Sequence, residues 1–212
     1  AEVGEAERAR TLVRELDEAF PAATKIGDVS VSPLREDEGL LGSQQDDLFS
    51  LNTPSITTAA SVQGAWRLMP GIAFAGRYTV GYTPTVEAGG DSLVREVSSV
   101  RTDSFALGLM QADAWRSGDR LGLTLSQPLR TTSGTMSFDM PIGNNAAGQM
   151  QYASRAFDLE TSGRELRTEL HYTTPLDRHQ QLGVALAHRN QPDHAAGARD
   201  DNMVAVRWQL RF

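Results

Sequence analysis

The chain has 212 residues, of which 40% are hydrophobic and 22% are charged, a balance that excludes an intrinsically disordered protein. Its apolar runs are only a few residues long, far short of the roughly 18 that a membrane-spanning helix needs. The net charge of −7 arises within residues 1–50, which hold 12 acidic and 5 basic side chains, so we expect no nucleic-acid partner.

The first predicted element is an amphipathic helix over residues 4–20. Ala9, Leu12, Val13, Leu16 and Phe20 recur at helical spacing, and charged residues occupy the other positions. A proline at position 21 ends the pattern, because proline cannot continue a helix. We therefore treat residues 1–24 as a separate N-terminal helical segment.

From about residue 25 onward, apolar and polar residues alternate with the period of two that is typical of β-strands. The stretches 54–69 and 71–82 flank a Met-Pro-Gly turn, which predicts a hairpin. A first strand is expected within residues 26–43, and further strands at 105–115, 121–125, 136–142, 150–159, 166–172, 182–187 and 203–212. This gives about ten antiparallel strands, in a range of roughly 8–12.

The predicted strands and their connections have unusual lengths. The strands run to roughly nine to eleven residues, whereas strands of soluble proteins average about five or six. Long connections are expected at 43–53, 83–98 and 190–201, all on one side of the sheet, and short turns at 69–71, 116–119 and 175–180 on the other. Three segments break this alternation: 131–134 and 161–163 are too short for their side, and 143–149 is too long.

Aromatic and charged residues occupy different phases of the strands. Near strand ends on or close to the apolar phase lie four aromatics that would form an interfacial girdle: Trp66, Tyr82, Trp115 and Tyr172. The other phase is rich in small residues and carries the arginines expected to face the lumen of a closed barrel: Arg67, Arg77, Arg167, Arg189, Arg207 and Arg211.

These features favour an all-β fold, an antiparallel up-and-down transmembrane β-barrel formed by residues 25–212 in a bacterial outer membrane. The segment 1–24 would be either a plug inside the lumen or a linker outside it. A soluble β-sandwich, acting as an interaction domain at the C-terminus of a secreted protein, is the alternative, since its strands also alternate.

The final decapeptide, MVAVRWQLRF, places Trp208, Leu210 and Phe212 on the apolar side of the last strand. This ending resembles the assembly signal of bacterial outer-membrane barrels, which the barrel-assembly machinery reads. Residues 101–212 also resemble the C-terminal translocator-like barrel of autotransporter-type subtilisin-family serine proteases of Gram-negative bacteria. The stretches that carry this second resemblance are SVRTDSFALGL, GDRLGLTLSQPLR, SGREL and RNQPDHAAGARDD.

The resemblance implies an outer-membrane domain that anchors, and helps to export, a passenger protein located upstream. Outer-membrane lipid and the barrel-assembly machinery would be its other partners. The sequence departs from the family in strand number, since translocators usually have twelve strands and a helix through the pore, and in lacking the protease. A small stand-alone outer-membrane barrel or pore is therefore a further alternative.

The sequence gives no pattern for catalysis or for a bound cofactor. A serine at position 137 lies in a run that superficially resembles a subtilisin motif, but no aspartate and histidine motifs precede it. The four histidines lack metal-ligand spacing, and the absence of cysteine excludes thiolate sites. We expect no enzymatic activity, no cofactor and no metal.

Overall fold

The computed structural model describes residues 25–36, 51, 53–88 and 92–210 of the chain. Within these ranges twelve strands form two antiparallel sheets, which confirms the predicted all-β antiparallel class. No helix in this described part is long and apolar enough to cross a membrane. The helix predicted within residues 1–24 lies outside the described residues.

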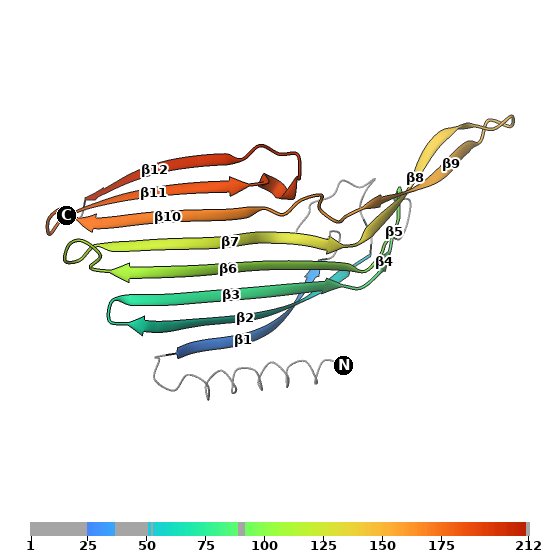
Figure 1. The fold of residues 1–212 in the computed structure, drawn as a ribbon. Coiled ribbons are helices and arrows are strands. Elements are labelled where there is room, and N and C mark those ends of the chain that lie inside the picture. The colour runs from blue at the N-terminus through green and yellow to red at the C-terminus, as the bar shows by residue number, and fades with distance from the viewer. Residues whose placement is uncertain (1–24, 37–50, 52, 89–91, 211–212) are drawn as a thin grey trace.

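Eight strands of 10–15 residues form the larger sheet, and every neighbouring pair is antiparallel. In sheet order they are β1 (Lys25–Glu36), β2 (Ser55–Met69), β3 (Ile72–Thr83), β6 (Val100–Ala112), β7 (Arg120–Ser133), β10 (Leu166–Pro175), β11 (Gln180–Asn190) and β12 (Asp201–Leu210). Among the described residues no strand pairs with the outer edge of β1 or of β12. This sheet is therefore open, not the single closed barrel of about ten strands that the sequence predicts (Figure 1).

The smaller sheet has the order β4 (Val86–Glu87), β5 (Val94–Val97), β8 (Thr135–Asn144) and β9 (Met150–Asp158). It lies at one end of the larger sheet, and the β8–β9 hairpin projects beyond it (Figure 1). The strands predicted at 136–142 and 150–159 thus exist, but their assignment to the main sheet is wrong. They leave it as an excursion because β7 pairs directly with β10, with Leu123 opposite Leu170.

This excursion explains the segments that break the predicted alternation of connections. All three belong to the excursion or adjoin it, so they do not connect neighbouring strands of the larger sheet. The connections of that sheet are then long at 37–54, 84–99, 134–165 and 191–200 and short at 70–71, 113–119 and 176–179. We call the two ends of the sheet the long-loop end and the short-turn end; β1 begins and β12 finishes at the latter.

The buried hydrophobic side chains of the described residues are few and lie together. Leu51, Val86, Val94, Val97 and Val100 form this cluster, and each is at most 7% exposed. Partly buried side chains of the smaller sheet and its flanks pack against it, including Met136 and Phe138. The core thus sits at the long-loop end, next to the smaller sheet, and the middle of the eight-stranded sheet contributes nothing to it.

Candidate functional surface

The cross-strand register brings the predicted apolar positions onto one face of the eight-stranded sheet. A single row of directly opposed residues crosses seven strands: Trp66, Phe74, Leu109, Leu123, Leu170, Leu186 and Val204. Parallel rows add Val62, Tyr78, Leu107, Leu125, Tyr172, Val184, Val206 and Trp208. We call this side of the sheet the apolar face.

No other layer of the described structure covers the apolar face. The exposed fraction is 43% for Leu109, 45% for Leu123, 39% for Leu170 and 70% for Val204. Soluble monomers rarely leave a contiguous apolar surface of more than a few hundred Å² uncovered. A β-sandwich would bury this face against a second sheet, but the smaller sheet packs at the long-loop end instead.

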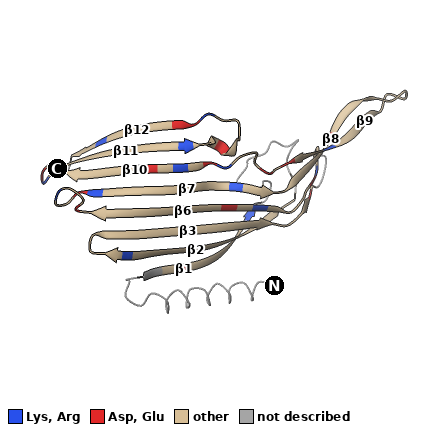
Figure 2. Ribbon diagram, viewed as in Figure 1, with Lys and Arg blue, Asp and Glu red and all other residues tan. Residues whose placement is uncertain are grey.

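The opposite face, the polar face, carries small and polar residues with arginines between them. The register places there all five described arginines of the predicted lumenal set: Arg67, Arg77, Arg167, Arg189 and Arg207. Arg211 lies outside the described residues. Charged positions lie mainly toward the two ends of the strands (Figure 2). Hydroxyl pairs link neighbouring strands, as in the 2.8 Å hydrogen bond between Ser61 and Thr79.

The polar face is hollowed. One hollow of about 440 Å³ extends over five neighbouring strands and is lined by Asp28, Gln63, Ala75, Arg77, Ala106 and Thr124, among others. A second, of about 270 Å³, lies between Arg167, Glu169, Ala187 and Arg189. Small residues such as Ala75 and Ala106 leave this space between longer side chains. The apolar side chains lie on the opposite, uncovered side of the sheet, whereas a soluble sandwich or barrel buries its apolar side.

The aromatic residues of the predicted girdle divide between the two ends of the sheet. At the short-turn end, Trp66 stacks on Phe74 with ring centroids 5.6 Å apart, and Trp115 meets Tyr172 edge-on at 5.1 Å. Trp208 also lies near this end, where its Nε1 donates to Gln180. Tyr82 lies at the long-loop end of β3. Phe74 was not among the aromatic residues predicted for the girdle.

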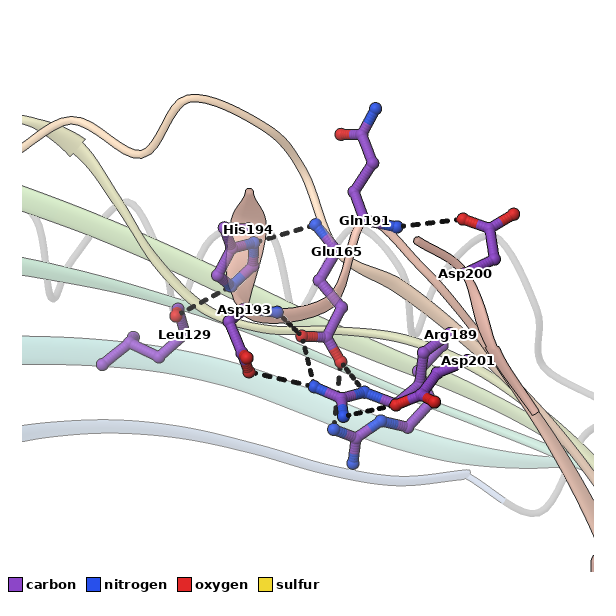
Figure 3. Close-up of polar contacts among 9 residues, drawn as sticks. Leu129, Glu165, Arg189, Gln191, Asp193, His194, Asp200 and Asp201 are labelled. Atoms are coloured by element: carbon purple, nitrogen blue, oxygen red, sulfur yellow. Dashed lines mark hydrogen bonds and ion pairs between the residues drawn. The ribbon is translucent and has the colours of Figure 1, made fainter. Parts of the chain in front are cut away.

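A buried carboxylate organises the long-loop end, as Figure 3 shows. Glu165 is only 2% exposed and accepts hydrogen bonds from Arg189 Nε (2.9 Å), Arg189 Nη2 (3.1 Å), Arg167 Nη2 (3.0 Å) and the amide of Asp193 (2.8 Å). The hydrogen bonds from Arg189 outweigh burial and, with the other donors, lower the pKa of Glu165 to about 2. Arg189 also contacts Asp193 and Asp201.

His194 continues this cluster toward β7. Its Nδ1 accepts the amide hydrogen of Glu165 at 2.9 Å, so its Nε2 carries the proton that points to the carbonyl of Leu129 at 3.1 Å. Gln191, Asp193 and His194 all have positive φ, a conformation that costs about 1–3 kcal/mol for each such residue. The contacts of Glu165 and His194 hold this strained connection against the sheet.

A second buried carboxylate organises the turn 113–119 at the short-turn end. Asp119 is 1% exposed and accepts hydrogen bonds from the amides of Ala114, Trp115 and Arg116 and from Tyr172 Oη. Burial raises the pKa of Asp119, but these four donors outweigh it and the pKa is lowered. Sequence reasoning predicts a turn here but not this carboxylate-centred cradle, which fixes the exposed Trp115 beside Tyr172.

The described residues offer little to a metal or a nucleophilic mechanism. Within them, no three histidine or acidic side chains gather closely enough to hold a metal ion. Ser137 Oγ donates to the carbonyl of Glu96 at 3.3 Å. His171 lies over Gly122, where a Cβ atom would come within 2.1 Å of its ring.

The chain matched no protein-family model, no curated protein and no solved structure in three comparisons with known proteins. The resemblance to autotransporter barrels thus stays a prediction from the sequence.

Proposed function

We propose that the chain is a small β-barrel of a Gram-negative outer membrane that anchors a passenger protein. The observation that carries the membrane assignment is that the eight-stranded sheet leaves its apolar face uncovered and places its arginines, among small and polar residues, on the opposite face. Such a sheet suits hydrocarbon outside and a polar interior. The passenger, which would lie upstream, is proposed from the sequence resemblance alone.

The dimensions of the apolar face support a membrane location. Phe74 and Tyr82 lie eight residues apart on β3, which is about 27 Å along the strand. A strand tilt of about 40° reduces this to roughly 21 Å, comparable to the apolar band of about 25 Å in outer-membrane barrels. The Trp66, Trp115, Tyr172 and Trp208 side chains would then lie at one interface, and Tyr82 at the other.

Closure of the sheet through β1 and β12 forms part of the proposal. Each unpaired backbone group in hydrocarbon costs several kcal/mol, so both open edges must find partners. The sheet order makes β1 and β12 run in opposite directions, and Val29 and Val31 of β1 lie on the same face as Val204, Val206 and Trp208 of β12. Pairing them would give a closed barrel of eight antiparallel strands, an even number that bacterial outer-membrane barrels use.

The size of such a barrel favours anchoring over export. An interior enclosed by eight strands is just wide enough to be filled by side chains. In this chain Arg77, Arg167 and Arg189 occupy the polar face and would fill much of that space. We therefore place anchoring first; a stand-alone barrel without a passenger would have the same structure.

Gel mobility in detergent tests the membrane proposal. The protein, folded in detergent and run on an SDS gel without boiling, should migrate as a compact band, and boiling should shift it to the mobility of its 23.0 kDa chain. Protein kept in urea and never refolded serves as the control, since heating should leave its mobility unchanged. A chain that stays monomeric and folded without any detergent would contradict the proposal.

Sequencing the precursor upstream of Ala1 tests the passenger separately. A protease or other secreted domain there would support the anchoring role. A signal peptide directly before Ala1 would instead contradict an upstream passenger, whatever the gel shows.

A further inference from the structure

Charged side chains gather on one part of the apolar face, at the long-loop end of β6 and β7. Arg101 and Asp103 lie on that face because they pair with Tyr82 and Val80 of β3. Arg130 pairs with Asp103 from β7, and the two side chains form an ion pair of 3.3 Å. Charged positions of the two strands accordingly lie side by side at this end (Figure 2).

A third arginine joins this group from the connection before β10. The guanidinium carbon of Arg164 lies 5.8 Å from the centroid of the Phe105 ring. Arg164 Nε donates to Gln127 Oε1, and Gln127 Nε2 in turn donates to Asp103 Oδ1 at 2.9 Å. Gln127 is only 1% exposed. We define the arginine cluster as these linked residues with the neighbouring Arg101, and it carries a net charge of +2: Arg101, Asp103, Gln127, Arg130 and Arg164.

The arginine cluster has more hydrogen-bond donors than acceptors. Within the described part of the chain, Arg130 and Arg164 donate through Nε alone, and no acceptor meets the guanidinium of Arg101. The one carboxylate, Asp103, already accepts from Gln127 and Arg130. The Nη donors of three guanidinium groups therefore remain for a ligand, and two of these arginines, Arg101 and Arg164, are exposed.

The place of the cluster on the sheet indicates what kind of anion it meets. This step rests on the proposed function, which puts Tyr82 at a membrane interface, and Arg101 lies directly opposite Tyr82. Long arginine side chains at such a level extend their charges to the lipid headgroups. The apolar side chains beside the cluster, Leu107 and Leu125, are 40% and 37% exposed and would contact acyl chains. A ligand with a phosphate and acyl chains fits both parts of this surface.

We propose that the arginine cluster binds the phosphate group of a membrane lipid. A cation at the edge of hydrocarbon is costly unless an anion pairs with it, and the planar guanidinium group matches the geometry of phosphate oxygens. Arg101, Arg130 and Arg164 donate to these oxygens through their Nη atoms. Asp103 and Gln127 position two of the arginines by holding their Nε atoms.

The same end of β11 and β12 provides a contrast. There the apolar face carries His188 and Asn202, whose Nδ1 and Oδ1 atoms lie 3.0 Å apart. The described residues of these two strands include no arginine on this face. The lipid phosphate is therefore placed over β6 and β7.

Competition between lipids tests the proposal on the unaltered chain. Energy transfer from the tryptophans to a phosphatidic acid with a fluorescent tail reports binding to the protein folded in a mild non-ionic detergent. Unlabelled phosphatidic acid should displace the probe at least about tenfold more effectively than phosphatidylcholine with the same chains, because choline offsets the phosphate charge. Equal displacement by the two lipids would overturn the proposal. Displacement by inorganic phosphate would overturn the choice of a lipid, since free phosphate has no acyl chains.

Two double variants locate the binding site. Arg101→Gln with Arg164→Gln should raise the apparent dissociation constant for the fluorescent phosphatidic acid about tenfold or more. Arg155→Gln with Arg199→Gln, which removes two exposed arginines outside the cluster, is the matched control and should leave it unchanged. An equal loss of affinity in both double variants, or no loss in either, would overturn the proposal.

Gel mobility without boiling shows whether each of these proteins has folded. If the double variant gives no compact band, Arg101→Gln alone decides the question, because the Arg101 side chain contacts no acceptor in the described part of the chain. That single variant should bind phosphatidic acid at least about threefold more weakly, and unchanged affinity would overturn the proposal. A compact band for the original chain with no preference for phosphatidic acid would reject the lipid site and leave the barrel, whereas the absence of that band would reject the barrel itself.

Discussion

The two sheets of this protein differ in the exposure of their apolar side chains. In the smaller sheet and its flanks, Val94 and Val97 are at most 2% exposed and form part of a conventional buried cluster. In the larger sheet, Leu123 and Trp208 alternate just as regularly with small or polar neighbours but are 45% and 64% exposed. Alternation therefore fixes which residues share a face, and the curvature and cover of the sheet determine what that face contacts.

The strongest test of this difference between the two sheets is a charged substitution on the apolar face. Leu125→Arg should destabilise the protein folded in lipid vesicles by about 2–4 kcal/mol, because the arginine would face hydrocarbon near the middle of β7. Thr124→Arg, one residue earlier, directs the same side chain into the hollow of the polar face and should cost much less. Urea unfolding of the vesicle-embedded proteins measures both.

The order of these two variants distinguishes membrane from water. If the apolar face were solvated, Leu125→Arg would cost little and Thr124→Arg, placed in the hollow of the polar face, would be the worse of the two. That reversed order would contradict a lipid-facing surface.

A smaller effect is expected where the long-loop end is ion-paired. Glu165→Gln should destabilise the contacts of the 191–200 connection by about 2 kcal/mol, since it removes a buried charge from partly exposed arginines. Trypsin should then cut faster after Arg199, which lies in that connection. Glu160→Gln, an exposed glutamate on the neighbouring connection, should leave the cleavage rate unchanged.

The stability that this cluster contributes should fall in acid. The pKa of Glu165 is about 2 in the folded protein against an ordinary 4.5, so its contribution is complete above about pH 5. It is lost as the pH falls from about 4.5 toward 2. Hydrogen exchange of the Asp193 amide, which donates to Glu165, should accelerate relative to intrinsic exchange over this range. An unchanged protection factor down to pH 2 would show that the carboxylate does not hold the connection.

Much of the larger sheet follows from local sequence. The alternation around Phe74, Leu109, Leu170 and Leu186 predicts the apolar face, because a strand has only two faces and its residues take them in turn. The same argument predicts where Arg77 and Arg207 lie. It does not predict closure, which depends on how the edge strands meet.

Periodicity could not assign β8 and β9 to their sheet. Met136, Phe138 and Met140 alternate with Ser137 and Asp139 just as membrane strands do. Whether two strands continue a sheet or leave it depends on β7 pairing with β10 across the gap, a contact between residues 41 to 53 positions apart. The mismatched connection lengths at 131–134, 143–149 and 161–163 were the available signal.

The local sequence could not predict the ion-paired cluster around Glu165 either. Glu165, Arg189 and His194 come from separate segments, and only the register of β10 with β11 brings Arg167 opposite Arg189. Nothing in the neighbouring residues distinguishes the buried Glu165 from Glu169, which is only partly buried. The positive φ angles of Asp193 and His194 are likewise consequences of these contacts and not of a turn motif in the sequence.

The smallest expected effect is on hydrogen exchange at the short-turn end, where the carboxylate of Asp119 holds the turn 113–119 together. Asp119→Asn keeps the shape of the side chain but replaces one acceptor oxygen by an amide nitrogen, so not all of the donors from Ala114, Trp115, Arg116 and Tyr172 can be satisfied. Hydrogen exchange at these amides should accelerate roughly three- to tenfold, while exchange of the 191–200 connection stays unchanged. Asp113→Asn, at an exposed aspartate of the same turn that accepts a hydrogen bond from the amide of Gly118, should affect the three amides less. Equal acceleration in both variants would mean that Asp119 is one of several equivalent contacts in the turn. The two ends of the sheet would then differ in kind, because a buried charge would fix the long-loop end and only the shortness of the turn would fix the short-turn end.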